Sequence, residues 1–331
     1  MSVQRTLILS RRQVTGLLDI NECSTAVERA FLFHAEGKSL PPGVLGVQAR
    51  GGGFHIKAAG LELDRLYFAA KVNGNFSTNP IVGLPAIQGI IVLCDGENGS
   101  PLAVMDSIEI TLIRTGAATA VAAKRLARKN SKIATICGCG NQGRIQLRAL
   151  RNILPIERVF LYDMNETQAQ KLCGDISGGI EASVASLVEL PSAIGQSDVV
   201  VTCTPSRNAF LKREWVSPGT FLAAVGADSA EKQELDPTLL SSSRVVVDVL
   251  EQCATIGELH HALAAGLMTV EDVHADLSEL VAGRKPGRST ESEIIIFDST
   301  GTALQDVAAA ALVYEKALGS GIGTWIDMTG S

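Results

Sequence analysis

The chain has 331 residues, of which 46% are hydrophobic, 19% charged and 4% aromatic, and its formal net charge is −6. This length accommodates two domains with sizeable cores, while the negative charge and the few aromatic residues disfavour nucleic acid, which binds basic surfaces with stacking rings. Small molecules are therefore the expected partners.

Neither a secretion signal nor a membrane span is predicted. Only a few apolar residues precede Arg11 and Arg12, too few for a signal-peptide core, and no apolar run approaches the ~18 residues of a transmembrane helix. The seven cysteines form no C-x-x-C pair, which fits a reducing compartment. We expect a cytoplasmic protein with no membrane partner.

The first third of the chain predicts a mixed α+β segment. A short strand, TLILS, is followed by a helix from about 11 to 37 and by strands near 43–49, 53–59, 66–72 and 85–95. An Ala-rich helix then follows within SIEITLIRTGAATAVAAKRLARK (107–129).

Residues 131–301 alternate apolar strands with helical stretches, which is typical of a parallel sheet covered on both faces. The predicted strands are KIATICG (132–138), RVFLYD (158–163), SDVVVTCTPS (197–206), GTFLAAVGAD (219–228), RVVVDV (244–249) and EIIIFDSTG (293–301). The tail TALQDVAAAALVYEKAL predicts a helix that could return to the first segment. We therefore expect an α/β fold: a Rossmann-type doubly wound sheet over 116–302, and a discontinuous α+β domain over 1–115 plus 303–331.

A complete G-x-G-x-x-G lies in the stretch IATICGCGNQGR, at Gly138, Gly140 and Gly143, between a predicted strand and a predicted helix. Such glycines permit a tight turn, close approach of a pyrophosphate and close helix packing. Asp163 ends the next strand 163 − 138 = 25 residues later, near the spacing of a carboxylate that accepts from ribose hydroxyls. The pattern predicts dinucleotide binding, and the acidic residue favours NAD over NADP.

Other interpretations exist for this segment. Asp163 can also cap the helix that contains NETQAQKL. Cys137 and Cys139 share one face of the strand, so a metal contact is conceivable there. The sequence offers no second Cys or His pair to complete four zinc ligands, and we predict no metal site.

Basic residues interrupt two apolar strands of the first segment. His55 and Lys57 in FHIKAAG share a face because strand side chains alternate, and Lys71 lies in FAAKVNG. A lone strand lysine is ordinarily a solvated edge charge. Because two lysines interrupt apolar strands of one domain, a functional contact with an anion or an imine is as well supported here as the solvated charge.

Two further candidates lie at element boundaries. Arg114 and Thr115 are expected at the entrance of the Ala-rich helix, where guanidinium and free backbone N–H groups could bind a carboxylate. The alternative is a surface arginine at a helix start. Asp228 follows a buried strand at the edge where open α/β sheets bind ligands, and a helix N-cap is its alternative interpretation.

Several segments together resemble the ornithine cyclodeaminase/mu-crystallin family and, within it, the archaeal type of NAD-dependent alanine dehydrogenase. They are GLP at 83–85 after Lys71, the block LAVMDSIEITLIRTGAATAVAAKRLARKNS, then GCGNQG, AVGADSAEKQELD and IIIFDSTGTALQDVA. The likeness extends nearly from end to end. It implies a homodimer whose first domain contributes both substrate contacts and the subunit interface, next to an NAD-binding Rossmann domain.

The resemblance also implies roles for individual residues. Lys71 would contact the reacting group of the substrate, Arg114 its carboxylate, and Asp228 would move a proton. The residues implied to line the cofactor are Arg114, Thr115, Gly138, Gly140, Asn141, Gln142, Gly143, Asp163, Thr204, Asp228, Lys232 and Ser299. In one departure, His55 stands where relatives commonly carry an arginine, with Lys57 two residues on; this pair could replace the cation or select a different acid.

The leading expectation is an NAD-dependent amino acid dehydrogenase, or imino acid reductase, acting on a small L-amino acid. One alternative is a cyclodeaminase that uses bound NAD without net NADH formation. That subgroup is expected to place a glutamate in the strand before Lys71, where this chain has basic residues. The other alternative is a non-catalytic cofactor- or ligand-binding protein like mu-crystallin, which the retention of Lys71, Arg114 and Asp228 disfavours.

Overall fold

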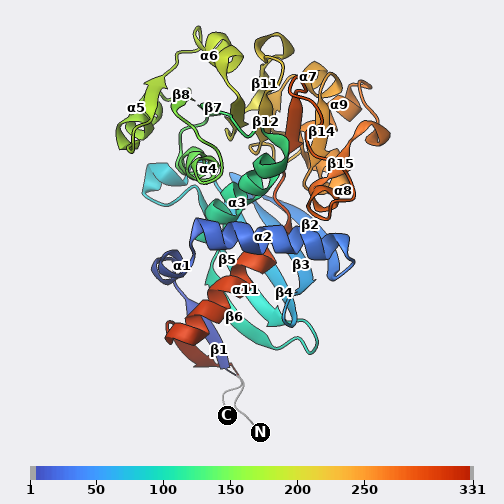
Figure 1. Cartoon of the computed structure of the whole chain (residues 1–331). Helices are drawn as coiled ribbons and strands as arrows, with labels where there is room; N and C mark the ends of the chain where they lie inside the picture. Colours follow the sequence, from blue (N-terminus) through green and yellow to red (C-terminus); the bar gives the residue numbers. More distant parts are fainter. Residues whose placement is uncertain (1–4, 329–331) are drawn as a thin grey trace. The chain divides into compact units, whose positions relative to one another are not determined.

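The computed structural model describes residues 5–328. The chain forms two compact units, one comprising the chain up to Ala117 and from Thr302 onward, the other Ala118–Gly301. Both ends of the sequence therefore contribute to the first unit. Figure 1 shows α11, near the C-terminus, beside elements from the N-terminal third.

The first unit is a mixed seven-stranded sheet with helices. Its strand order is β17-β1-β6-β5-β4-β3-β2. The elements are β1 (Arg5–Leu9), α1 (Arg11–Leu17), α2 (Ile20–Ala35), β2 (Ser39–Ala49), β3 (Gly52–Glu62), β4 (Leu66–Asn75), β5 (Ile87–Asp95), β6 (Pro101–Asp106), the first part of α3 (Ile108–Leu126), α11 (Ala303–Ser320) and β17 (Thr324–Asp327), with a short 3-10 helix η1 (Asn79–Val82).

Helices α2 and α11 pack on each other; α11 also packs on the strands β3 and β4, and α2 on β3 (Figure 1). Along β4, every second residue is buried on the face that the helices cover, as Tyr67, Ala69 and Lys71 are. This alternation places the side chains of Lys57 and Lys71 beneath the helices and not in water.

The predicted single helix over 11–37 is wrong, because the chain forms two helices there. Leu18 is extended, and the Asp19 carboxylate accepts hydrogen bonds from the backbone N–H groups of Asn21 and Glu22. An aspartate in this position caps a new helix instead of continuing the old one. The break separates α1 from α2.

The second unit contains an eight-stranded sheet in which every neighbouring pair is parallel, in the order β15-β14-β16-β12-β10-β7-β8-β9. Its strands are β7 (Ile133–Cys137), β8 (Arg158–Tyr162), β9 (Glu181–Val184), β10 (Val199–Thr202), β12 (Phe221–Ala224), β14 (Arg244–Val247), β15 (Ala275–Asp276) and β16 (Ile295–Asp298); β11 (Arg207–Leu211) pairs separately with β13 (Gln233–Leu235). The helices are α4 (Asn141–Arg151), α5 (Glu166–Asp175), α6 (Leu190–Gln196), α7 (Pro237–Ser241), α8 (Leu250–Ile256), α9 (Glu258–Ala264) and α10 (Leu277–Val281), with 3-10 helices η2 (Arg213–Trp215) and η3 (Val270–Asp272).

The strand order reverses direction at β7. The chain runs outward from β7 through β8 to β9, then returns to place β10 on the other side of β7. Open α/β sheets bind ligands at such a reversal, beyond the carboxyl ends of the strands. The Rossmann-type fold predicted from the apolar runs is confirmed, and the glycine loop follows β7 directly.

No helix among residues 5–328 is both long enough and apolar enough to cross a membrane.

Candidate functional site

The glycine loop adopts the geometry that a dinucleotide requires. Gly138 has φ +102°, and a Cβ there would lie 2.8 Å from the Cys203 carbonyl oxygen. A Cβ on Gly143 would lie 2.0 Å from the Gly138 carbonyl oxygen, so only glycine lets α4 approach the loop this closely. At Gly140, by contrast, a Cβ would meet nothing within 4 Å. The backbone there faces open space, as a phosphate-binding turn demands.

Polar groups beside the loop add to this fit. The Asp163 carboxylate accepts from the Cys139 N–H at 2.8 Å and from the Asn165 N–H at 2.8 Å, which leaves it capacity for further donors. The Gln142 Nε2 atom at the start of α4 is buried and has no hydrogen-bond partner among the described residues. A helix N-terminus with a free side-chain donor favours an anion. These residues therefore fit a dinucleotide pyrophosphate.

Asp163 is not the N-cap of α5, because Asn165 occupies that position. The carboxylate instead ties the end of β8 to the glycine loop. Burial raises the pKa of the Cys137 and Cys139 thiols, so both stay protonated and pack as small core residues.

The other residues predicted to line the cofactor follow neighbouring strands of the same sheet. Thr204 comes two residues after β10, and Ser299 comes directly after β16. Asp228 comes four residues after β12; its side chain is 49% exposed and accepts a hydrogen bond from Lys232 Nζ at 2.6 Å. No helix begins at Asp228, since β13 is the next element, so the N-cap interpretation is wrong.

The two strand lysines lie opposite each other in the first unit. Lys57 of β3 pairs in register with Lys71 of β4, and His55 pairs with Asn73. Lys57 is 5% exposed and Lys71 is 3% exposed, so the interpretation as solvated edge charges is wrong. His55 is only partly buried. The shared face predicted for His55 and Lys57 is present.

Arg114 lies in the second turn of α3 and not at its entrance, which corrects the position predicted from the sequence. The helix begins at Ile108, so the N–H groups of Arg114 and Thr115 lie within the helix and offer no anion site. The Thr115 hydroxyl donates to the Thr111 carbonyl oxygen at 2.7 Å. The Arg114 side chain is 4% exposed, so it is not a surface arginine either.

A carboxylate that the sequence analysis missed links these cations. Asp306, in the first turn of α11 and 1% exposed, accepts from Lys71 Nζ at 2.9 Å and from Arg114 Nε at 3.0 Å. The neighbouring Gln305 accepts from Arg114 Nη1 at 2.7 Å. Lysine and arginine are thus held side by side by one buried acid.

The electrostatics of this cluster shift the pKa values of both Lys71 and Asp306. Burial, with the charges of Arg114 and Lys57, lowers the pKa of Lys71 to about 7, although the Asp306 carboxylate opposes the shift. Burial alone would raise the pKa of Asp306, but the charges of Lys71 and Arg114 outweigh it and lower that pKa. Lys71 can therefore gain or lose a proton near neutral pH, which is what a general acid or base needs. Asp306 stays ionised.

The sequence did contain a signal for Asp306. It interrupts an otherwise apolar, Ala-rich helix face, and a carboxylate in such a position is rarely buried without a cationic partner. Lys71 and Arg114, already identified from the sequence as candidate site residues, were the available partners.

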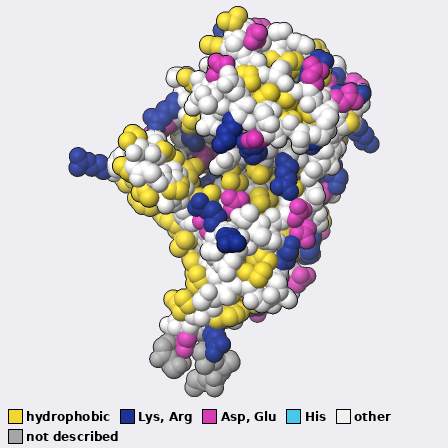
Figure 2. Space-filling view, turned by 90° about the vertical axis from the view of Figure 1, so that its left-hand side faces the viewer, with side chains coloured by type: hydrophobic (Ala, Val, Ile, Leu, Met, Phe, Trp, Pro, Cys, Tyr) yellow, Lys and Arg dark blue, Asp and Glu magenta, His cyan; other side chains and the backbone are white. Residues whose placement is uncertain are grey.

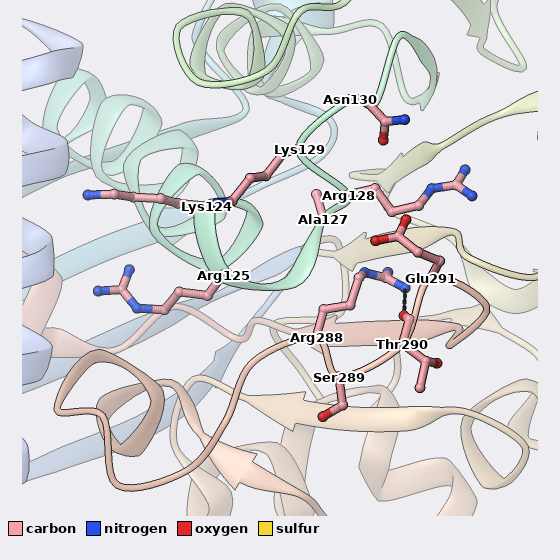
Figure 3. Close-up of a pocket in the computed structure, with 10 residues that line it drawn as sticks. All are labelled: Lys124, Arg125, Ala127, Arg128, Lys129, Asn130, Arg288, Ser289, Thr290 and Glu291. Carbon is pink, nitrogen blue, oxygen red and sulfur yellow. Dashed lines mark hydrogen bonds between the residues drawn. The ribbon is translucent and has the colours of Figure 1, made fainter.

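A separate basic cavity of about 440 Å³ lies in the second unit, at the end of α3. Figure 3 shows Lys124 and Arg125 on the helix, Lys129 on the following turn, and Arg288 donating to the Thr290 carbonyl oxygen. Arg288 also donates from Nε to the Leu126 carbonyl oxygen at 2.8 Å, so it caps the carboxyl end of α3. None of the residues predicted for the site lines this cavity. The role of Arg288 there is structural, because it caps α3.

Comparison with known proteins identifies the relatives of this arrangement. Residues 4–321 match the profile of the ornithine cyclodeaminase/mu-crystallin family. The alanine dehydrogenase of Archaeoglobus fulgidus is 44% identical over 324 residues, covering 97% of this chain and 98% of the relative. This chain belongs to the ornithine cyclodeaminase/mu-crystallin family. The resemblance inferred from the sequence motifs is confirmed.

Solved structures of the family share the fold along the whole chain. An archaeal alanine dehydrogenase dimer with bound NAD has a TM-score of 0.92 at 43% identity, covering 98% of this chain and 99% of that one. The Δ1-pyrroline-2-carboxylate reductase of Thermococcus litoralis, in complex with NADH and L-proline, has a TM-score of 0.91 at 37% identity, covering 96% and 99%. These relatives were solved with NAD or NADH bound, which agrees with the glycine loop of this chain, whose geometry fits a dinucleotide.

Proposed function

We propose that this protein is an NAD-dependent amino acid dehydrogenase, or imino acid reductase in the opposite direction, acting on a small L-amino acid. The observation that carries the proposal is the buried cluster of Lys71, Arg114 and Asp306 in a chain that also has a glycine loop fitted to a dinucleotide. Relatives with bound NAD or NADH act on alanine or on a cyclic imino acid, according to their names. The net reaction would convert an amino acid, NAD and water into a 2-oxo acid, ammonia and NADH.

The basic side chains are proposed to bind the substrate carboxylate. Lys57, Lys71 and Arg114 are buried; Lys57 lies in register with Lys71, and Asp306 holds Lys71 and Arg114 side by side. Buried basic groups favour an anionic ligand, so the substrate carboxylate is the group proposed to bind beside them. Arg114 offers the planar guanidinium that suits a carboxylate, and Lys57 offers a second cation.

Proton handling is proposed to fall to Lys71 and Asp228. Lys71, with its pKa near 7, can exchange a proton with the reacting nitrogen or carbonyl oxygen. The partly exposed Asp228 can direct water and shuttle its proton to solvent. Bound NAD would supply the acceptor for the substrate's α-hydrogen as hydride. The residues proposed to hold the cofactor are the glycine loop, Asp163, Thr204, Lys232 and Ser299.

We also propose a homodimer formed through the first unit. The sheet face opposite α11 carries apolar side chains in register, with Ile56 of β3 beside Val72 of β4 and Val72 beside Ile90 of β5. Phe54 is 41% exposed and Ile90 47% exposed. Figure 2 shows exposed hydrophobic side chains, in yellow, along the left-hand edge of the view. Contiguous exposed apolar surface is typical of an interface. We also propose a cytoplasmic location, because the seven cysteines are free, as in a reducing compartment.

The test is a paired assay on purified protein with NAD and a panel of alanine, proline, aspartate, ornithine and lysine. NADH absorbance and ammonia are followed in the same wells, and we expect both to rise together with one small amino acid. Ammonia without NADH, from a diamino acid alone, would identify a cyclodeaminase and refute the proposal. The matched control is Lys71→Met, which should lose turnover yet keep its affinity for NADH.

A further inference from the structure

A buried glutamate links the loops that follow two strands of the second unit. Glu234 of β13 is 0% exposed. Its Oε1 accepts from the Thr204 N–H at 2.6 Å, and its Oε2 accepts from the Gly226 N–H at 3.0 Å. Thr204 belongs to the loop after β10, and Gly226 precedes Asp228 by two residues in the loop after β12. One carboxylate therefore fixes both loops at the ligand-binding edge of the sheet.

The contact between the Glu234 carboxylate and the Gly226 backbone is too close to admit a side chain at Gly226. A Cβ on Gly226 would lie 2.3 Å from Glu234 Oε2, so glycine is needed for the carboxylate to reach the backbone. A glutamine in place of Glu234 would offer one acceptor oxygen and one donor NH2 to two converging N–H donors. One of the two loops would lose its partner.

A second buried carboxylate holds the backbone of Glu234, and a third holds the helix that carries the second. Glu258, the first residue of α9, accepts from the Glu234 N–H at 2.7 Å and from the Leu235 N–H at 3.1 Å. Asp298, the last residue of β16, accepts from the Leu259 N–H at 2.9 Å. All three carboxylates are 0% exposed. A continuous series of acid-to-backbone contacts thus runs from β16 through α9 to the loops at 204 and 226.

Such an arrangement is costly if stability is its only purpose. Burial raises the pKa of Glu234, Glu258 and Asp298, that of Asp298 to about 7, which shows that the interior disfavours their charged forms. An apolar core could hold β13 to α9 without that cost. What a carboxylate offers in addition is two oxygens at a fixed separation, each fixing one loop.

We propose that Glu234 is a positioning residue, which sets the placement of the Thr204 loop against the Asp228 loop at the cofactor-binding edge. Both of its carboxylate oxygens accept from backbone N–H groups, so it acts through these two backbone segments. The inference rests on the proposed function for the meaning of that edge, since Thr204 and Asp228 are assigned there to cofactor and proton transfer.

The experiment compares full-length Glu234→Gln with Glu231→Gln. Glu231 lies three residues earlier, is 61% exposed and forms an ion pair with Arg207, so it is a matched surface control. Amide hydrogen exchange is measured over the loops 203–206 and 225–228, and NADH affinity by fluorescence titration. In Glu234→Gln we expect faster exchange in at least one of these loops and an NADH Kd raised about tenfold, because small displacements of binding groups have effects of this size or more. Glu231→Gln should match the wild type.

Gly226→Ala provides a second route, because its methyl group displaces the same carboxylate from the other side. It should raise the NADH Kd in the same direction. If both variants fold and keep an NADH Kd within about twofold of wild type, Glu234 only stabilises the fold and the proposal is wrong. Loop exchange and NADH affinity do not depend on turnover, so a wild type that binds NADH but oxidises no amino acid would refute the dehydrogenase while leaving the role of Glu234 supported by these readouts.

Discussion

Replacing Asp306 by asparagine tests the central feature of the buried cluster that Lys71, Arg114 and Asp306 form. The carboxylate lies 2.8 Å from Lys71 Nζ and 3.0 Å from Arg114 Nε, and all three side chains are at most 5% exposed. At about 2.8 Å and an effective dielectric constant of about 20, the Lys71 pair alone has a Coulomb energy of about 6 kcal/mol. Desolvation offsets part of it, and measured losses for breaking buried pairs are about 3–5 kcal/mol.

We expect Asp306→Asn to lie near the lower end of that range, about 3 kcal/mol, when unfolding is measured near pH 6. Asparagine keeps an oxygen that can accept from Arg114, and Lys71 can release its proton. The second effect is on that proton. Because Asp306 raises the pKa of Lys71 against burial, its removal must lower that pKa below the wild-type value of about 7.

The assay is the pH dependence of kcat/KM with the amino acid identified by the panel. The wild type should show an inflection near pH 7 from Lys71, and Asp306→Asn should move it to lower pH by at least about one unit, if a quarter of the Coulomb energy is realised. Asp64→Asn, at a carboxylate with 96% exposure in the same unit, is the control and should leave the inflection unchanged. An inflection that stays in place or moves to higher pH would refute the assignment of Lys71 and Asp306 as a coupled pair.

Three other perturbations give defined outcomes. Gly143→Ala should weaken NADH binding by about 100-fold or more, since its methyl group would lie 2.0 Å from the Gly138 carbonyl oxygen. The control, Gly174→Ala, has open space around the new methyl group and should keep the wild-type affinity. Equal NADH affinities of the two variants would contradict the loop assignment. Lys57→Met should raise KM for the amino acid about tenfold with a smaller change in kcat, and unchanged KM values for all acids would remove the second carboxylate contact. Burial raises the pKa of Asp298 to about 7, so its contribution to stability is greatest in acid and is lost as pH rises from about 4 through 7. In Asp298→Asn, the free energy of unfolding in urea should therefore depend less on pH over that range. An unaltered pH dependence would show that Asp298 is ionised in the folded protein.

Features encoded locally were predictable from the sequence. The strands β7, β8, β10, β12, β14 and β16 are continuous apolar runs, and the glycine loop is a complete motif in its proper context. The strands β6, β9, β11, β13, β15 and β17 were missed. Among them, β9 and β17, with the residues EASV and TWID, are half-buried or exposed and show no apolar run, so only pairing with a neighbour defines them.

Features that depend on distant pairing were not predictable in the same way. Asp306 meets Lys71 across 235 residues of sequence and Arg114 across 192. Glu234 reads as an ordinary charge between Gln233 and Leu235, and nothing local shows that its carboxylate reaches two loops. Partners of this kind follow from strand order and helix return, which single-sequence patterns do not specify.

The return of α11 to the first unit has a consequence for the order of folding during synthesis. Strands β3 and β4 and the start of α3 leave the ribosome long before residue 306, so Lys71 and Arg114 exist for a time without the carboxylate that pairs with them. Burying these two cations without it is unfavourable, so the first unit, although begun first, closes only after the second has been made. A nascent chain or fragment that ends before α11 would keep this face hydrated and could not form the cluster of Lys71, Arg114 and Asp306. Arrival of the C-terminal helix is therefore the step that completes the first unit.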